Sequence, residues 1–199
     1  KLTLWKINDF HNAKAINFAY SNNTIQFNDN TLDQYNSYIL FNDQGNFSAP
    51  EFVSKVENQN LHSITDADLI IVYHPKFKSE ALRLKKHRED FSKFKVEAVD
   101  ITKVYNEFSS GAPDVSAIRD MMRMFYKKAI GPLDMPKYLL LIGDGSYDNK
   151  NREYSTNNLI LTWQSASGCS FTGSYVTDDF FGLLDDDEGN VNSGEEVDI

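Results

Sequence analysis

The chain has 199 residues, of which 41% are hydrophobic, 25% are charged and 13% are aromatic. This composition is typical of a folded globular protein, and it argues against a disordered chain, a coiled coil or a transmembrane bundle. The one cysteine, Cys169, excludes an internal disulfide and a cysteine-based zinc cluster.

Charge is divided unevenly along the sequence. Residues 153–199 contain ten Asp and Glu but neither Lys nor Arg, which gives a net charge of −10. Because the whole chain carries −9, residues 1–152 carry +1. Nucleic acids and anionic membranes bind basic patches, so neither is an expected partner. The acidic end suits a cation or a basic peptide better.

The first 65 residues have the pattern of a small β-rich segment followed by a connector. Residues 1–48 contain the short strand-like stretches LTLWKI, KAINFAY, TIQF and NSYILF, separated by polar turns. Residues 49–65 have mixed character. We therefore predict a β-rich appendage over 1–48 and a connector over 49–65.

Residues 66–199 alternate between strand and helix patterns. Apolar or alternating runs predict strands at 67–75, 94–101 and 137–145, and amphipathic periodicity predicts helices at 79–91 and 114–129. Asp114 after Pro113 is typical of a helix start. A further strand that ends in an acidic turn is predicted within SYVTDDFFGLLD. The alternation indicates an α/β fold with a mostly parallel sheet and flanking helices.

Ligands of parallel sheets bind beyond the carboxyl ends of the strands, where His74, Asp100 and the run GDGSYD fall. A tight turn is the favoured interpretation of this run. The alternative is a magnesium loop formed by Asp144 and Asp148 in a metal-dependent phosphatase. Such a phosphatase also needs a DxD motif after a strand, whereas the DAD at 66–68 precedes its strand.

Two further clusters could carry chemistry. Cys169 could form a thiol–imidazole dyad with His74, although its Ser- and Gly-rich surroundings favour an incidental loop thiol. The acidic turn DDDEGNVNSGEE departs from the EF-hand spacing, because Gly189 arrives one position early. A looser calcium site formed by Asp185, Asp187 and Glu196 competes with a solvated hairpin tip. No other cofactor is expected.

Several stretches resemble the gingipain-type cysteine peptidases. They are VENQNLH, VYNEFSSGAPDVSAIRDMMRMFY, YLLLIGDGSYD, TGSYVTDDFFGLLDDDEG and EVDI, which follow one another in the family's order. Together they span most of residues 50–199 and are far more specific than a lone GDG. The resemblance is closest to the sortases of the type IX secretion system of Bacteroidota, in which a β segment similar to LTLWKI precedes the peptidase domain.

This resemblance implies a caspase-like α/β fold over 66–199 and, for the intact protein, a thiol peptidase or transpeptidase at the cell surface or outer membrane. It would remove the C-terminal sorting signal of secreted cargo proteins, alongside other type IX components, and pass the acyl group to an anchor such as a lipopolysaccharide amine. In the family the catalytic His and Cys follow the strand that begins near EVDI. The 199-residue chain is therefore expected to be an inactive amino-proximal part.

The resemblance also bears on single residues. The family places an acidic side chain just ahead of that strand, where it can orient the catalytic His. Asp198 matches this position best, with Glu196 as the second choice, whereas Asp178 matches an acidic position that we interpret as structural. Cys169 has no counterpart among the family's nucleophiles.

The class-level alternative is a non-enzymatic α/β interaction module that calcium could stabilise. Self-association of the chain is also expected, because its apolar strands need cover on both faces.

Overall fold

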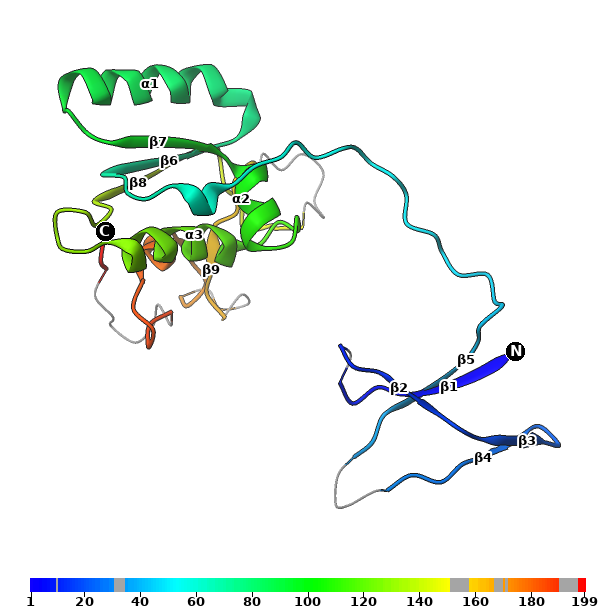
Figure 1. Ribbon diagram of the computed structural model, residues 1–199. Coiled ribbons are helices and arrows are strands. Elements are labelled where there is room, and N and C mark those ends of the chain that lie inside the picture. Colours follow the sequence, from blue (N-terminus) through cyan, green and yellow to red (C-terminus); the bar gives the residue numbers. More distant parts are fainter. Residues whose placement is uncertain (10, 31–34, 151–157, 167–169, 171, 190–196) are drawn as a thin grey trace. The chain divides into compact units, whose positions relative to one another are not determined.

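The structure is a computed structural model that describes residues 1–9, 11–30, 35–150, 158–166, 170, 172–189 and 197–199 (Figure 1). The chain divides into two compact units, Lys1–Val56 and Glu57–Ile199. The division falls inside the segment expected to be a connector. In the described part of the chain, no helix is long and apolar enough to cross a membrane.

The first unit is built from short antiparallel strands. Its three-stranded sheet has the order β2-β1-β5, and a separate hairpin pairs β3 with β4. The bounds are β1 (Leu2–Lys6), β2 (Lys14–Ile16), β3 (Ala19–Ser21), β4 (Thr24–Gln26) and β5 (Tyr38–Asn42). Among the described residues of this unit only Leu4 is buried. The unit therefore has a very small core.

The second unit contains a three-stranded parallel sheet in the order β7-β6-β8. Its strands are β6 (Leu69–Tyr73), β7 (Val96–Asp100) and β8 (Tyr138–Ile142). Every residue of β6 is buried, because this central strand has side chains packed against both of its faces. The strand–helix–strand order and the parallel pairing confirm the predicted α/β class.

Helices cover both faces of this sheet (Figure 1). The helix α1 (Lys78–Phe91) lies on one face, where Ala81 packs with Leu69 and Ile71. The helices α2 (Ile101–Phe108) and α3 (Val115–Lys128) lie on the other face, where they form the larger core with β6 side chains. The largest fully buried side chains of α3 are Ile118, Met121, Met122 and Phe125.

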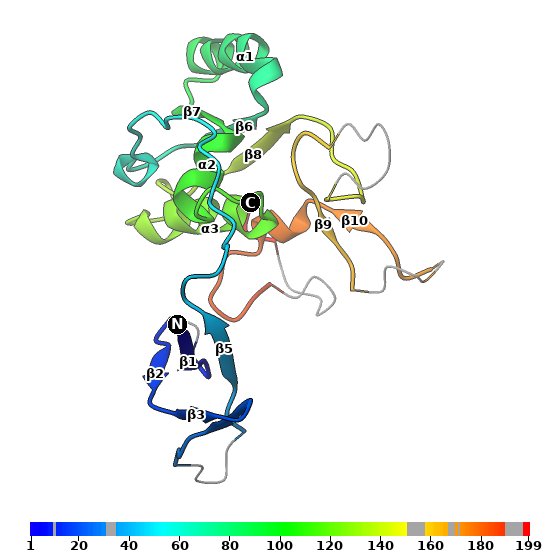
Figure 2. The same ribbon diagram turned by 90° about the vertical axis from the view of Figure 1, so that its right-hand side faces the viewer.

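Short elements complete the second unit. The strands β9 (Trp163–Gln164) and β10 (Val176–Thr177) pair antiparallel. The 3-10 turns are η1 (Leu61–Ser63), η2 (Pro75–Phe77) and η3 (Asp179–Gly182) among the described residues. Figures 1 and 2 place η3 beside α3. In the sequence η1 precedes β6, η2 precedes α1, and β9, β10 and η3 follow β8.

Three details differ from the sequence-based expectations. The helix α2 was not predicted. Only Val176–Thr177 of SYVTDDFFGLLD is a strand, because the chain then turns at Asp179–Gly182, where the Phe181 N–H donates to the Asp178 oxygen at 3.0 Å. The sequence of the 79–91 helix places Phe91 on its apolar side with Ala81 and Leu84, yet Phe91 is 78% exposed at the last turn of α1.

Candidate functional site

The carboxyl ends of β6 and β7 carry two of the predicted site residues. The His74 N–H donates to the Ile142 oxygen at 2.9 Å, and its Nδ1 accepts from the Lys76 N–H at 3.3 Å, which caps η2. Asp100 Oδ1 accepts from the N–H of Thr102 at 2.9 Å and from its hydroxyl at 2.8 Å, which caps α2. Both side chains therefore stabilise the starts of helical turns at this edge.

The GDG run after β8 forms a close turn. The main-chain oxygen of Asp144 accepts from the N–H groups of Leu159 at 2.8 Å and Ile160 at 3.1 Å. A Cβ on Gly143 would lie 2.8 Å from the Ile160 side chain, and one on Gly145 would lie 3.1 Å from the Ile160 oxygen. The glycines thus let a second segment approach the turn. This geometry supports the tight-turn interpretation, with the main chain of Asp144 rather than its carboxylate receiving the amides.

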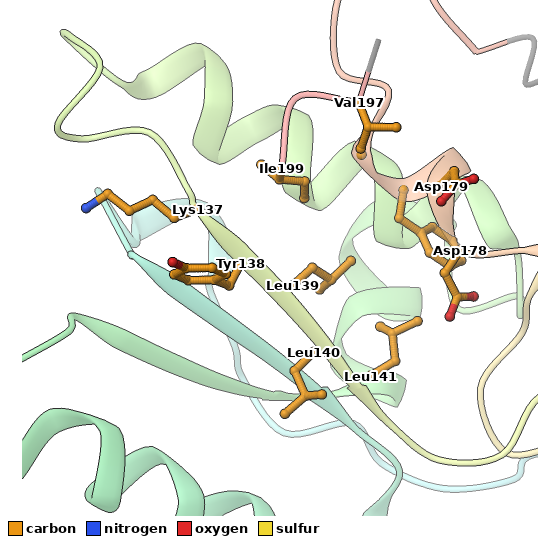
Figure 3. A pocket seen from close by; sticks show the side chains of 11 residues that line it. Lys137, Tyr138, Leu139, Leu140, Leu141, Asp178, Asp179, Val197 and Ile199 are labelled. Atoms are coloured by element: carbon orange, nitrogen blue, oxygen red, sulfur yellow. The ribbon is translucent and has the colours of Figure 1, made fainter. Parts of the chain in front are cut away.

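A groove of about 440 Å³ runs along β8 (Figure 3). One wall is residues 137–141, and the other is η3 together with Val197 and Ile199. Figure 3 shows Lys137 and Asp178 near opposite ends of the row of β8 side chains. Apolar side chains of β8 thus line the middle of the groove, acidic side chains lie at one end, and at the other end the Lys137 ammonium donates to the Asp68 carboxylate.

Asp178 also lines a second cavity of about 210 Å³ at the carboxyl end of β8. Its Oδ1 accepts from the hydroxyl of Thr162 at 3.2 Å, and Thr162 is 8% exposed. The same hydroxyl lies 3.3 Å from the Thr177 oxygen, so the two acceptors share its proton. Asp178 is the acidic side chain common to both cavities at this end of the sheet.

The acidic turn after η3 is bound to α3 by arginines. Arg119 donates to the main-chain oxygens of Leu183 at 2.6 Å and Glu188 at 2.9 Å, and Arg123 donates to the oxygen of Leu184 at 3.1 Å. The Arg119 guanidinium also lies against Gly189, which has a φ of +126°. The turn is therefore shaped by the surface of α3.

Ion pairs also connect α3 to the acidic turn. Arg123 and Lys127 both donate to the carboxylate of Asp186. The Lys127 ammonium is the main cause that lowers the pKa of Asp186 below its usual value, and Arg123 adds to it. Asp185 accepts from the Tyr126 hydroxyl at 3.2 Å. The turn's negative charge is thus partly balanced by α3.

Asp198 contacts the turn from the other side. Its Oδ2 accepts from the Leu184 N–H at 2.9 Å, and its own N–H donates to the Gly182 oxygen at 2.9 Å. A Cβ on Gly182 would lie 2.6 Å from the Val197 side chain. The segment Val197–Ile199 therefore packs closely against η3, and only glycine at 182 permits this approach.

The structure places the remaining predicted residues as follows. Asp185 and Asp187 are exposed on the acidic turn, whereas Glu196 and Cys169 lie outside the described residues. Within the described part of the chain, no group of three or more His, Cys, Asp or Glu side chains is arranged to hold a metal ion. The calcium set and the thiol–imidazole dyad remain predictions.

Glu107 makes contacts that its sequence pattern did not predict. Its carboxylate accepts from the Leu61 N–H at 2.7 and 2.9 Å, from His62 Nδ1 at 2.7 Å and from Gln59 at 2.9 Å. Burial raises the pKa of Glu107, but these hydrogen bonds outweigh burial and lower the pKa to about 2. No local pattern marks this role, because its partners lie more than 40 residues away.

The arginines of α3 were also missed, although a signal for them exists. Arg119, Arg123 and Lys127 recur at every fourth position and therefore lie on one side of the helix, next to its apolar stripe. A row of cations beside a core-facing stripe indicates an acidic partner within the fold.

A parallel sheet with helices on both faces and a groove beside its edge strand defines an α/β domain of the caspase-like class. The chain belongs to peptidase family C25, the gingipain family, whose sequence profile matches residues 62–198.

The chain is similar to the crystal structure of dimeric latent PorU from Porphyromonas gingivalis, with 34% sequence identity over 96% of this chain and a TM-score of 0.75. It spans 19% of the length of that chain. Among curated proteins, no sequence matches significantly. The family resemblance drawn from the sequence is thereby confirmed.

Proposed function

We propose that this chain is the amino-proximal part of a gingipain-like cysteine peptidase that removes C-terminal sorting signals from secreted cargo proteins. The observation that carries the proposal is the similarity to PorU over 96% of the chain at 34% identity, joined to the family match over 62–198. Because the chain spans 19% of PorU, the activity, the cargo and the partners all belong to the proposal.

The proposed chemistry needs a thiolate and an imidazole, which other parts of the protein would supply. The thiolate attacks the scissile carbonyl, the C–N bond breaks, and the imidazolium gives its proton to the leaving amine. Water or an amine then attacks the thioester and releases the thiolate. An amine acceptor, such as that of a lipopolysaccharide, makes the reaction a transpeptidation. The 199 residues alone are proposed to be inactive.

Within this proposal Asp198 orients the catalytic imidazole. Its carboxylate is already fixed through Oδ2 by the Leu184 N–H, which supports a precise placement. An Asp198→Asn variant of the full-length protein is expected to lower kcat by about 100-fold or more, as loss of a His-orienting acid does. A loss of thermal stability with unchanged kcat would assign Asp198 a structural role only.

The proposed location is the cell surface, where other type IX secretion components would be partners. The test uses the full-length protein and a cargo protein that carries a C-terminal sorting signal. Mass spectrometry should detect the released signal peptide, and prior alkylation of thiols should abolish its release. The isolated 199-residue chain is the matched inactive control.

Two outcomes would contradict the peptidase proposal. Cargo binding without cleavage, unchanged by alkylation, would indicate the non-enzymatic interaction module. Magnesium-dependent release of phosphate from p-nitrophenyl phosphate would indicate the phosphatase instead.

Calcium is proposed only as a structural ion at Asp185, Asp187 and Glu196. Isothermal titration with CaCl₂ tests this, and an Asp187→Asn variant should bind more weakly because the ion prefers carboxylate oxygens. An Asp43→Asn variant, altered in the first unit, is the control. Absence of binding heat in the unaltered protein would remove calcium from the proposal.

A further inference from the structure

The two walls of the β8 groove are held in different ways. The wall formed by β8 is fixed by parallel pairing with β6, from Leu69 and Tyr138 to Tyr73 and Ile142. Among the described strands, β6 is the one that pairs with β8. The opposite wall, η3 with Val197 and Ile199, is anchored in the core by Phe180 and Phe181, and the segment that follows η3 has a further support.

That support comes from α3. Arg119 and Arg123 donate to three main-chain oxygens, those of Leu183, Leu184 and Glu188. Leu183 is 2% exposed and Leu184 is 0% exposed, so this part of the turn is shielded from water. Hydrogen bonds from a guanidinium are charge-assisted, and a buried oxygen that loses its donor is costly.

Leu184 connects the helix to the groove wall. Its oxygen accepts from Arg123, and its N–H donates to the Asp198 carboxylate. The Asp198 N–H in turn donates to the Gly182 oxygen, which places Val197 and Ile199 against η3. A continuous series of hydrogen bonds thus runs from α3 through the turn to the groove wall.

The Arg119 contact is closely fitted. Its guanidinium lies over the Phe180 ring at 5.4 Å from the centroid and within 3.3 Å of the Cβ position of Gly189. Lys127, by contrast, pairs with a side chain and not with the main chain, and the Asp186 side chain is 77% exposed. Exposed ion pairs contribute little to stability.

We propose that Arg119 and Arg123 are positioning residues that hold the far wall of the β8 groove by binding the main chain of residues 183–188, which follow η3 and begin the acidic turn. The proposal concerns the fold and does not depend on the proposed peptidase reaction. Loss of either guanidinium should free the turn while the sheet stays intact.

Hydrogen exchange of the full-length protein, measured peptide by peptide, tests this. In Arg119→Met and Arg123→Met variants, exchange in the peptide spanning 180–189 should be about 10-fold faster or more, because the opening free energy of the turn falls. Peptides from β6 should exchange as before. Lys127→Met removes a positive charge that does not bind the main chain, so it is the matched control and should change exchange less than twofold.

Unchanged exchange in both arginine variants would overturn the proposal, and so would an equal effect of Lys127→Met. If a methionine variant also loses protection in β6, the domain has unfolded. Hydrogen exchange of the Arg119→Lys and Arg123→Lys variants then tests the proposal. Each lysine keeps the charge but lacks the planar fork that reaches several acceptors. Faster exchange confined to 180–189 in these variants supports the proposal, and unchanged exchange contradicts it.

Discussion

Glu107, a residue of α2, binds the segment 59–62, which precedes the parallel sheet. Its carboxylate accepts from Gln59, Leu61 and His62, and the His62 ring stacks on Phe108 with centroids 4.6 Å apart. The Lys128 ammonium donates to the oxygens of His62 and Ile64 from α3. A single carboxylate thereby organises a segment that has little regular structure of its own.

The lowered pKa of Glu107 predicts a pH-dependent contribution to stability. A pKa of about 2 instead of 4.5 corresponds to about 3 kcal/mol at neutral pH. This stability is present above pH 4.5 and is lost as the pH falls towards 2, because the folded carboxylate resists protonation. A Glu107→Gln variant should therefore be less stable by about 1–3 kcal/mol at pH 7, and the difference should roughly halve by pH 3.

Urea unfolding of both proteins at pH 7, 5, 4 and 3 measures this difference. Glu57→Gln, which alters an exposed carboxylate nearby, is the control and should change the free energy of unfolding by less than about 0.5 kcal/mol. A Glu107→Gln difference that does not depend on pH would refute the linkage.

Gly182 permits the close approach of Val197 to η3. A Cβ at this position would meet the Val197 side chain at 2.6 Å, so Gly182→Ala should displace the segment and cost about 1–3 kcal/mol. Gly131→Ala is a matched control, because no atom lies within 4 Å of the Cβ position there. Chemical denaturation of both variants tests the difference, and equal stability would show that Val197 moves without cost.

At the scale of elements, α3 uses two sides for two purposes. Its apolar side, with Ile118, Met122 and Phe125, packs against the sheet. Its cationic side, with Arg119 and Arg123, binds the acidic turn. The helix thus connects the core to the groove wall, and its stability affects both.

The start of α3 depends on a side-chain cap. Asp114 Oδ1 accepts from the Ser116 N–H at 2.9 Å, so Asp114→Ala should cost about 1 kcal/mol and lower Tm by about 2–4 °C. Asp114→Ser should retain most of the stability, because serine is also a good cap. Asp120→Ala, in the exposed middle of α3, should leave Tm unchanged or slightly raised. Calorimetry distinguishes these cases, and an unchanged Tm for Asp114→Ala would exclude a capping role.

The strand β8 was expected to be covered on both faces, yet Tyr138 is 53% exposed and Leu140 is 37% exposed. Tyr138 and Leu140 point to the same face of the sheet, where α1 packs mainly on β6 and β7, so this face of β8 is only partly covered. Self-association through β8, the edge strand of the described sheet, stays a prediction.

At the scale of the whole molecule, the two units differ in core size. The first unit buries Leu4 among its described residues, whereas the second has two apolar clusters on the two faces of its sheet. Small sheets with little buried surface are marginally stable alone. The second unit should therefore resist proteolysis better than the first.

Trypsin at low concentration tests this difference. Lys55 lies in an exposed segment between β5 and η1, so early cleavage after Lys55 should leave a resistant fragment that begins at Val56. A Lys55→Gln variant should delay the appearance of this fragment in mass spectra. Earlier cleavage within α1 or α3 would show that the second unit is the less stable one.

The sequence by itself was sufficient for the class of fold, the parallel strands, the helices α1 and α3 and the peptidase family. These features depend on local periodicity, caps and long similar stretches, all of which can be read along the chain. It did not predict α2, which is short, or the 3-10 turn at η3, where two neighbouring phenylalanines are buried together.

Only the tertiary structure decided the contacts between distant segments. Glu107 meets residues 59–62, Arg119 and Arg123 meet residues 183–188, and Asp198 is held by Leu184. Apart from the side-chain contacts of Glu107 with Gln59 and His62, these are hydrogen bonds between a side chain and the backbone of another segment, and backbone groups have the same chemistry at every position. No pattern of side chains can therefore specify which backbone group is reached. That choice is made when packing of α2 and α3 on the sheet brings the segments together.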